Sequence, residues 1–249
     1  FGPAVNAARG IAVQVQGAVT QFSTNFQTAI NPQIIKSYTV GDYAYMHSLI
    51  FHSSKFTFLL LATISFPVLL ETEMILQLWF ETVPNYTAVF VRLMLCTTII
   101  DAMAGAFMVS AQATGAVRVY QSVVGGILLT IVPVSYIVLK MGAEPWSLFI
   151  VHLCVCILAF AVRLFILCRM IHLSLSGYFT KVLLRCMGVL IIALPLPLIL
   201  LYFLSDTFIN SIMVCLSGLL AMLFSSYVIG LVSNERKFIK DKILLFLKL

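Results

Sequence analysis

The chain has 249 residues, of which 61% are hydrophobic and only 10% are charged, and its formal net charge is +6. Soluble domains are typically about 45–50% apolar and about 25% charged, so this composition excludes a soluble globular protein. A transmembrane β-barrel would show segments of about ten residues with alternating polarity, and the sequence contains no such segments. We therefore expect an all-α integral membrane protein.

Hydropathy and turn residues divide the chain into about seven segments suited to cross roughly 30 Å of hydrocarbon as helices. The predicted helices lie near residues 4–31, 49–71, 87–112, 119–140, 146–168, 181–204 and 208–232. They form one domain, 1–233, which a basic tail, 234–249, follows. Because the chain opens at Phe1 inside a helical pattern, we expect it to be a fragment that lacks preceding helices.

Breakers mark the boundaries of these segments. The predicted turns are Pro84-Asn85, Thr114-Gly115, Gly142 with Pro145, Ser176-Gly177 and Ser205-Asp206. Four prolines fall inside apolar runs, where a membrane helix accommodates them by kinking if neighbouring groups satisfy the freed carbonyls. These are Pro67, Pro133, Pro195 and Pro197.

The charges of the loops predict the orientation, because cytoplasmic loops carry an excess of Lys and Arg. Alternate loops place eleven basic residues on one side: Lys36, Lys55, Arg118, Arg169, Lys181, Arg185, Arg236, Lys237, Lys240, Lys242 and Lys248. The other side receives Lys140 alone, with most of the acidic residues. The chain is thus expected to start outside and to end in the cytoplasm, with its basic tail on the anionic inner leaflet.

The first predicted helix carries a polar stripe. At about 100° per residue, one face gathers Asn6, Arg9, Gln16, Thr20, Ser23, Thr24, Gln27 and Asn31, and the opposite face is apolar. We interpret the stripe as the wall of a water-filled cavity. Two alternatives are ordinary hydrogen bonding between helices and a helix that lies flat on the membrane, although a flat helix usually carries several Lys or Arg.

Asp101 lies at the middle of its predicted helix and is too short to reach the headgroups. An unpaired ionised carboxylate there costs at least about 2.5–3.5 kcal/mol on insertion scales, so Asp101 needs a partner or a proton. Ion coupling and a purely structural hydrogen bond are both open for it. Arg92 and Arg163 lie nearer to helix ends, and we expect their long side chains to extend to the interface.

The sequence contains no arrangement typical of an enzyme. There is no Ser/His/Asp set, no pair of loop carboxylates and no phosphate-binding glycine loop. The six cysteines lie in or beside apolar segments, and the four histidines are scattered. We therefore predict no catalytic residues, no metal and no cofactor, and no nucleic acid among the partners.

Two stretches carry a resemblance to a known family. Phe1–Tyr38, FGPAVNAARGIAVQVQGAVTQFSTNFQTAINPQIIKSY, resembles a mid-chain segment of the Wzx-type polysaccharide (O-antigen) flippases, especially Bacteroidetes members. Ser110–Leu129, SAQATGAVRVYQSVVGGILL, is similar to the same group. These proteins belong to the multidrug/oligosaccharidyl-lipid/polysaccharide (MOP) exporter superfamily, whose members have two helical lobes around a central cavity. The resemblance implies that the chain is the second lobe and that the first is missing.

The resemblance also implies a function. Such proteins move an undecaprenyl-diphosphate-linked oligosaccharide across the bacterial inner membrane, for surface polysaccharide or lipopolysaccharide synthesis, by alternating access and without ATP. Cationic cavity residues of the family receive the diphosphate, and Arg9 is the position here that fits. Asn6, Gln16, Thr20 and Gln27 would then face water or sugar hydroxyls, and Asp101 is the candidate for ion coupling. Membrane lipids would surround the lobe.

Two other functions compete with this one. A multidrug exporter of the same superfamily would handle amphipathic cations and would use cavity acids, which Asp101 favours. A membrane-embedded glycan polymerase would require a large extramembrane loop with catalytic residues, and the longest predicted loop has roughly 17 residues.

Overall fold

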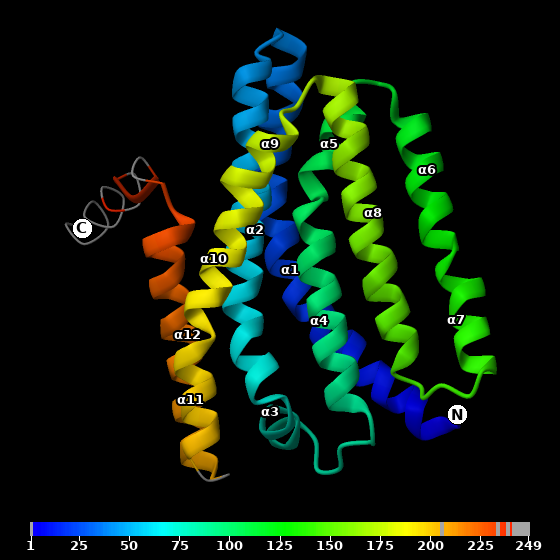
Figure 1. Ribbon diagram of the computed structural model, residues 1–249, viewed down its shortest axis with the longest axis vertical. Helices are drawn as coiled ribbons and strands as arrows, with labels where there is room; N and C mark the ends of the chain where they lie inside the picture. The colour runs from blue at the N-terminus through cyan, green and yellow to red at the C-terminus, as the bar shows by residue number, and fades with distance from the viewer. Residues whose placement is uncertain (1, 205–206, 233–234, 238–239, 241–249) are drawn as a thin grey trace.

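The computed structural model describes residues 2–204, 207–232, 235–237 and 240, and every regular element among them is helical. Figure 1 shows the long helices side by side in one bundle, with the chain running back and forth between its two ends. The elements are α1 (Pro3–Val40), α2 (Tyr43–Leu70), α3 (Thr72–Trp79), α4 (Thr87–Met103), α5 (Gly105–Ala113), α6 (Val117–Leu129), α7 (Ile131–Lys140), α8 (Ser147–Ile171), α9 (Leu175–Tyr178), η1 (Phe179–Leu183), α10 (Leu184–Ala193), α11 (Pro195–Phe203), α12 (Phe208–Ser225) and η2 (Ser226–Gly230).

Six helical segments are long and apolar enough to cross a membrane, so the chain is a multi-pass membrane protein. Apart from shifts of a few residues at their ends, they coincide with six of the seven predicted segments. They are Tyr43–Leu70, Thr87–Ala113, Val117–Lys140, Ser147–Ile171, Leu175–Phe203 and Phe208–Gly230.

The remaining predicted segment, 4–31, corresponds to α1, which is helical but is not among these six apolar segments. Its predicted end was wrong, because α1 continues through Pro32 to Val40. Pro32 lies on the exposed side of α1, where a missing backbone donor disturbs no packing. The helix ends at Gly41, whose φ of 79° is the left-handed conformation that glycine tolerates best. Asp42 then caps α2 by accepting a hydrogen bond from the Tyr45 backbone N at 3.0 Å.

The connections between the spans alternate between the two ends of the bundle, as the topology prediction requires. The turns at 41–42, 114–116 and 172–174 lie at the upper end in Figure 1, and those at 80–86 and 141–146 lie at the lower end. The predicted turn at Ser205-Asp206 and most of the predicted tail 234–249 fall outside the described residues. The predicted turn at Ser176-Gly177 lies inside α9 instead, because the chain reverses earlier, at His172–Ser174.

Three of the spans are interrupted. The junctions of α6 with α7 and of α10 with α11 lie beside Pro133 and Pro195, as the prolines predicted. Pro67, by contrast, lies inside a continuous α2. The third interruption, at Ala104 between α4 and α5, involves no proline and was not predicted. The short helix α3 was also missed, because eight residues are too few to show a clear period.

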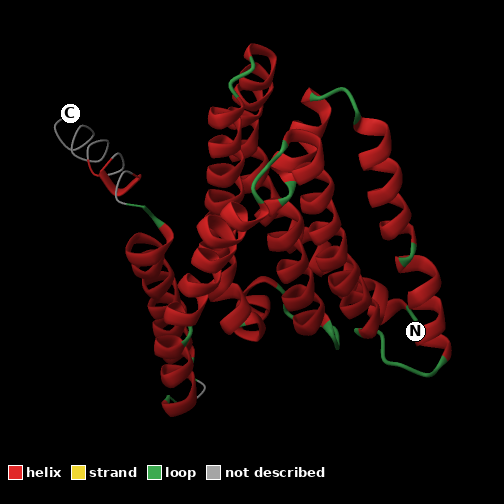
Figure 2. Ribbon diagram, turned by 45° about the horizontal axis from the view of Figure 1, so that its top comes forward, coloured by secondary structure: helices red, strands yellow, loops and turns green. Residues whose placement is uncertain are grey.

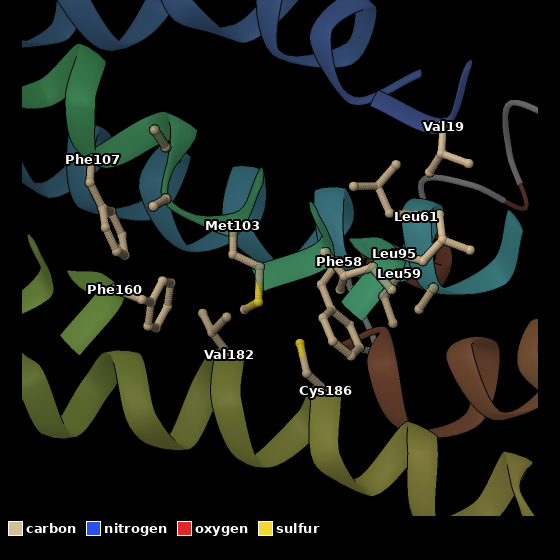
Figure 3. Packing of buried hydrophobic residues seen from close by; sticks show 14 of the residues in the cluster. Val19, Phe58, Leu59, Leu61, Leu95, Met103, Phe107, Phe160, Val182 and Cys186 are labelled. Carbon is tan, nitrogen blue, oxygen red and sulfur yellow. The ribbon is translucent and has the colours of Figure 1, made fainter. Parts of the chain in front are cut away.

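The packed centre of the bundle lies where α2 meets α1, α4 and the α10 region. Figure 3 shows Val19, Leu61 and Leu95 meeting from three helices, and Met103 facing Val182. Within its most apolar stretch, the α2 span is 56% buried and the α6–α7 span only 11%, so α6–α7 lies at the periphery, as Figure 2 also shows. Small residues at the seam, such as Ala8, Ala12 and Ser54, let the backbones approach closely, which drives helix association in lipid.

We predict the sidedness of four exposed loop positions from this arrangement and from the loop charges. In a variant without native cysteines, Cys at Asn85 or Met141 should react with an impermeant maleimide added outside intact cells. Cys at Ala116 or Ser174 should react only after the cells are opened. All four residues are exposed, so accessibility of the side chain is matched. The opposite labelling pattern would overturn the orientation.

Candidate functional site

A polar cavity of about 370 Å³ lies between α1, α4, α6 and α8 at the level of the span midpoints. Amide, hydroxyl and ionisable side chains make up most of its wall, although the surrounding spans are apolar. Its lining residues are Gln16, Thr20, Ser23, Thr24, Gln27, Thr97, Thr98, Asp101, Ala102, Gly105, Leu128, His152, Cys156 and Arg163. Polar groups at this depth are costly in hydrocarbon, so such a concentration marks a candidate functional site.

The cavity contains an ion pair between α4 and α8. Arg163 Nη1 donates a hydrogen bond to Asp101 Oδ1 at 2.6 Å. The Arg163 side chain is 15% exposed and that of Asp101 is 56% exposed, so the carboxylate opens more to the cavity. The expectation that Arg163 would extend to the interface was wrong. Arg163 lies two helical turns before the end of α8, and an acidic partner is close at hand.

Arg92 behaves as expected for a residue near a span end. Its Nε donates a hydrogen bond to Thr72 Oγ1 at 3.0 Å, and its Nη2 lies 3.8 Å from Glu73 Oε1. The Glu73 side chain is largely exposed. Arg92 therefore contacts α3 at the lower end of the bundle and is not the partner of Asp101.

The interruption of the α4–α5 span at Ala104 forms part of the cavity wall. The side chain of Gln27 in α1 donates a hydrogen bond to the Ala102 carbonyl at 2.8 Å, and Ser54 in α2 donates one to the Met103 carbonyl at 2.8 Å. Gly105 makes room for Gln27, because a Cβ added to it would lie 2.2 Å from Gln27 Oε1. Side chains from two neighbouring helices thus bond to carbonyls at the break, as a membrane interior requires.

A second hydrogen bond joins α1 to α4 lower in the wall. Gln16 Nε2 donates to Thr98 Oγ1 at 2.9 Å, and Thr98 Oγ1 donates to the Met94 carbonyl at 2.8 Å. The hydroxyls of Thr20 and Thr97 also donate to backbone carbonyls one turn earlier in their own helices. These hydroxyls keep acceptor capacity toward the cavity. The α1 and α4 parts of the wall, apart from Asp101, therefore offer neutral amide and hydroxyl groups.

The structure divides the predicted substrate-binding residues into two groups. Gln16, Thr20 and Gln27 lie in the cavity with Asp101. Asn6 and Arg9 instead line a separate pocket of about 300 Å³ at the lower end, beside Phe90 and Phe149. The polar stripe runs from Asn6 to Asn31, about 38 Å of helix at 1.5 Å per residue, so it passes more than one pocket. Of its members, Ser23 is buried and Asn31 lies in neither pocket.

Sequence reasoning missed the contribution of α8 to the cavity. His152, Cys156 and Arg163 are separated by four and seven residues, which places them along one face of the helix. The signal was present as a thin polar line in an otherwise apolar span. The pairing of Arg163 with Asp101 depends on which helices are neighbours, and periodicity within one helix cannot predict that.

The described residues contain no group of three or more His, Cys, Asp or Glu side chains that could hold a metal ion. No protein-family model, curated protein or solved structure matches the chain. The cavity geometry and its chemistry therefore carry the functional argument.

The ion pair generates the first stability prediction. Asp101→Asn should destabilise the protein by about 1–3 kcal/mol, because it leaves the half-buried Arg163 guanidinium without its anionic partner. Arg163→Gln should cost less, since the carboxylate is more exposed, and the double variant should cost less than the sum. Unfolding temperatures in detergent, followed by fluorescence-detected size exclusion, report these changes.

The exposed pair of Glu73 with Arg92 supplies the control, because Glu73→Gln should leave stability nearly unchanged. If Asp101→Asn and Glu73→Gln have equal effects, the Asp101–Arg163 pair does not stabilise the fold.

A second prediction concerns the break in the α4–α5 span. Gly105→Ala should displace Gln27 and should lower the free energy of unfolding by about 1 kcal/mol through the lost bond to the Ala102 carbonyl. Gly126→Ala, where a Cβ meets nothing within 4 Å, should be neutral or stabilising. In a Gln27→Ala background, Gly105→Ala should add no further cost. Destabilisation that persists in that background would show that Gly105 acts through another contact.

Proposed function

We propose that the chain is one lobe of a Wzx-type transporter that carries a lipid-linked oligosaccharide across the bacterial inner membrane, with α1 as a seventh span. The observation that supports this most is the polar cavity at the span midpoints. Its wall combines a polar helix with a side-chain ion pair inside a bundle of apolar spans. A bundle that only anchored a protein would have no reason to maintain so costly a wall.

The chemistry of the wall suits a sugar. Gln16, Thr20 and Thr97 offer amide and hydroxyl groups, which exchange hydrogen bonds with sugar hydroxyls about as readily as with water. Neutral hydrogen bonds hold such a substrate weakly enough for release, which a transport cycle needs. In this proposal a second lobe would supply the facing wall.

The ion pair suits the diphosphate and its coupling. The planar guanidinium of Arg163 offers several donors to phosphate oxygens, but in this conformation Asp101 occupies one of them. A proton delivered to Asp101 through the cavity removes the competing charge and leaves Arg163 available to the diphosphate. We therefore propose Arg163 as the positively charged residue that binds the substrate diphosphate at mid-depth, and we keep Asp101 as the coupling residue.

Arg9 and Asn6 receive a second role in this proposal. Their pocket lies at the lower end of the bundle, which the loop charges predict to face outward. Arg9 is exposed there and can meet the diphosphate as it leaves the central cavity. The path then has two cationic positions on the way out.

The competing candidate is a multidrug exporter, and one observation favours it. The Asp101 carboxylate is more than half exposed to the cavity, as an acid that receives a cationic drug should be. Arg163 beside it reduces that attraction. Efflux of ethidium that depends on Asp101, together with normal glycan transport by the Asp101→Asn variant, would support the exporter and contradict the flippase.

Export of surface glycan by the complete protein, in a host whose own flippase is deleted, tests the proposal. The expected order of activity is wild type, then Arg163→Lys, then Arg163→Ala. The alanine variant should fall at least about tenfold, the equivalent of one charge-assisted hydrogen bond of roughly 1.5 kcal/mol. Arg9→Ala should reduce export less.

Arg169→Ala is the matched control, because Arg169 lies on the same helix, outside the cavity, over the Phe165 ring. It should export like wild type at equal protein amount. Wild-type export by Arg163→Ala at matched expression would remove the diphosphate role of Arg163.

A further inference from the structure

A third pocket, of about 490 Å³, lies at the upper end of the bundle and is strongly basic. It is formed by the first turns of α2, by the segment from Ser174 to α10, and by the chain that follows η2. Its lining residues are Ala44, His47, Ser48, Phe51, His52, Lys55, Ser174, Lys181, Arg185, Val232 and Glu235. Three fixed positive charges, Lys55, Lys181 and Arg185, face one carboxylate, Glu235.

Glu235 already fills part of this pocket. Its two carboxylate oxygens accept hydrogen bonds from Lys55 Nζ at 2.7 and 2.6 Å, and His52 Nε2 lies 2.9 Å from Oε1. The backbone N of Val232 donates to Oε2 at 2.7 Å. Lys55 itself is only 3% exposed, and a buried ammonium requires an anionic partner.

The Glu235 carboxylate remains charged under cellular conditions. Burial raises its pKa, but the hydrogen bonds from His52, Lys55 and the Val232 backbone outweigh that effect and hold the pKa at about 2. Protonation near neutral pH therefore does not release Glu235 from the pocket. Another anion can take its place only by displacing the carboxylate.

Two of the three cations have no acidic partner among the described residues. In the described part of the chain, no ion pair joins Lys181 or Arg185 to an acidic residue. Lys181 Nζ lies instead over the Phe51 ring, 5.8 Å from its centroid. One carboxylate thus leaves two positive charges over, whereas a phosphate group brings more charge and more acceptor oxygens to the same place.

An apolar groove of about 400 Å³ adjoins the basic pocket along α2 and η2. Its wall includes Phe56 and Leu231, the neighbours in sequence of Lys55 and Val232 in the basic pocket. Lys55 Nζ also lies 5.4 Å from the Phe56 ring centroid. A cationic pocket at a span end, with an apolar groove beginning at the neighbouring residues of the span, matches the two parts of an anionic lipid.

We propose that this pocket binds the phosphate head group of an anionic membrane lipid through Lys55, Lys181 and Arg185, and that Glu235 is an internal competitor that occupies the site when the lipid is absent. Lipid binding would then displace Glu235 and the segment that carries it. Among the described residues of that segment, Arg236 also donates hydrogen bonds to the Val228 and Leu231 carbonyls. The proposal does not depend on the transported substrate.

Binding to the purified chain in nanodiscs tests this, with phosphatidic acid titrated into phosphatidylcholine as the probe. Glu235→Gln should bind phosphatidic acid more tightly than wild type, because the competitor has lost its charge. Lys181→Gln combined with Arg185→Gln should bind more weakly, by about fivefold for each cation removed. Lys55 stays unchanged, since its buried position makes a folding defect the expected result of its loss.

Two controls make the same charge changes elsewhere. Lys237→Gln removes an exposed cation from the segment after η2 without touching the pocket, and Glu81→Gln removes an exposed acid at the opposite end. Neither should change the affinity by more than about twofold, as expected for screened surface charges. If the Lys181/Arg185 variant behaves like Lys237→Gln, or if Glu235→Gln fails to tighten binding, the pocket is not the site.

A second arm separates a lipid from a soluble phosphate. Inorganic phosphate and glycerol 3-phosphate carry the head group without acyl chains, and they should bind much more weakly than phosphatidic acid if the groove accepts a chain. Binding of inorganic phosphate as tightly as phosphatidic acid would contradict the lipid assignment. Failure of phosphatidic acid and of both phosphates to bind would overturn the site altogether.

Discussion

The seam between α1 and α4 is the contact on which the rest of the bundle depends. A lipid interior offers no water to satisfy a broken helix or a polar side chain, so the interruption at Ala104 requires donors from its neighbours. Gln27 and Ser54 provide them, and Gly105 leaves the space that Gln27 needs. Because α1 brings Gln27 to this point, the polar residues one to three turns before it, Gln16, Thr20 and Thr24, line the same cavity. The satisfied break and the cavity thus share one wall.

The charged groups, like the broken helix, are satisfied by partners from neighbouring segments. Asp101 and Arg163 belong to different spans, and each would be expensive alone at this depth. Their pairing at 2.6 Å holds α4 against α8 while leaving the carboxylate open to the cavity. At the upper end, Lys55 and Glu235 repeat this pattern across a longer stretch of chain. In both places a carboxylate on one segment pairs with a cation on a neighbouring helix.

The sequence predicted the class of the fold and the position of six spans, because hydropathy over about 20 residues is a strong signal. It also predicted the polar stripe of α1 and the need of Asp101 for a partner or a proton. It could not predict the partner of Asp101, because that depends on which helices are neighbours. Nor did it predict the break at Ala104, which involves no proline. There Gln27 of α1 packs against Gly105 and bonds to the Ala102 carbonyl. Arg9 and Gln27 shared a stripe, yet the length of α1 carries them into different pockets.

The polarity of α1 has a consequence for how such a chain enters the membrane. Segments partition from the translocon into lipid according to their apolar content, and residues such as Gln14, Gln21 and Asn25 on the exposed side of α1 oppose that step. The partners of Gln16 and Gln27 lie in α4 and are synthesised 82 and 75 residues later. During biogenesis α1 must therefore wait in a protected place until α4 arrives. A chaperone-like insertase cavity, or helices made before it, would shelter it in that interval.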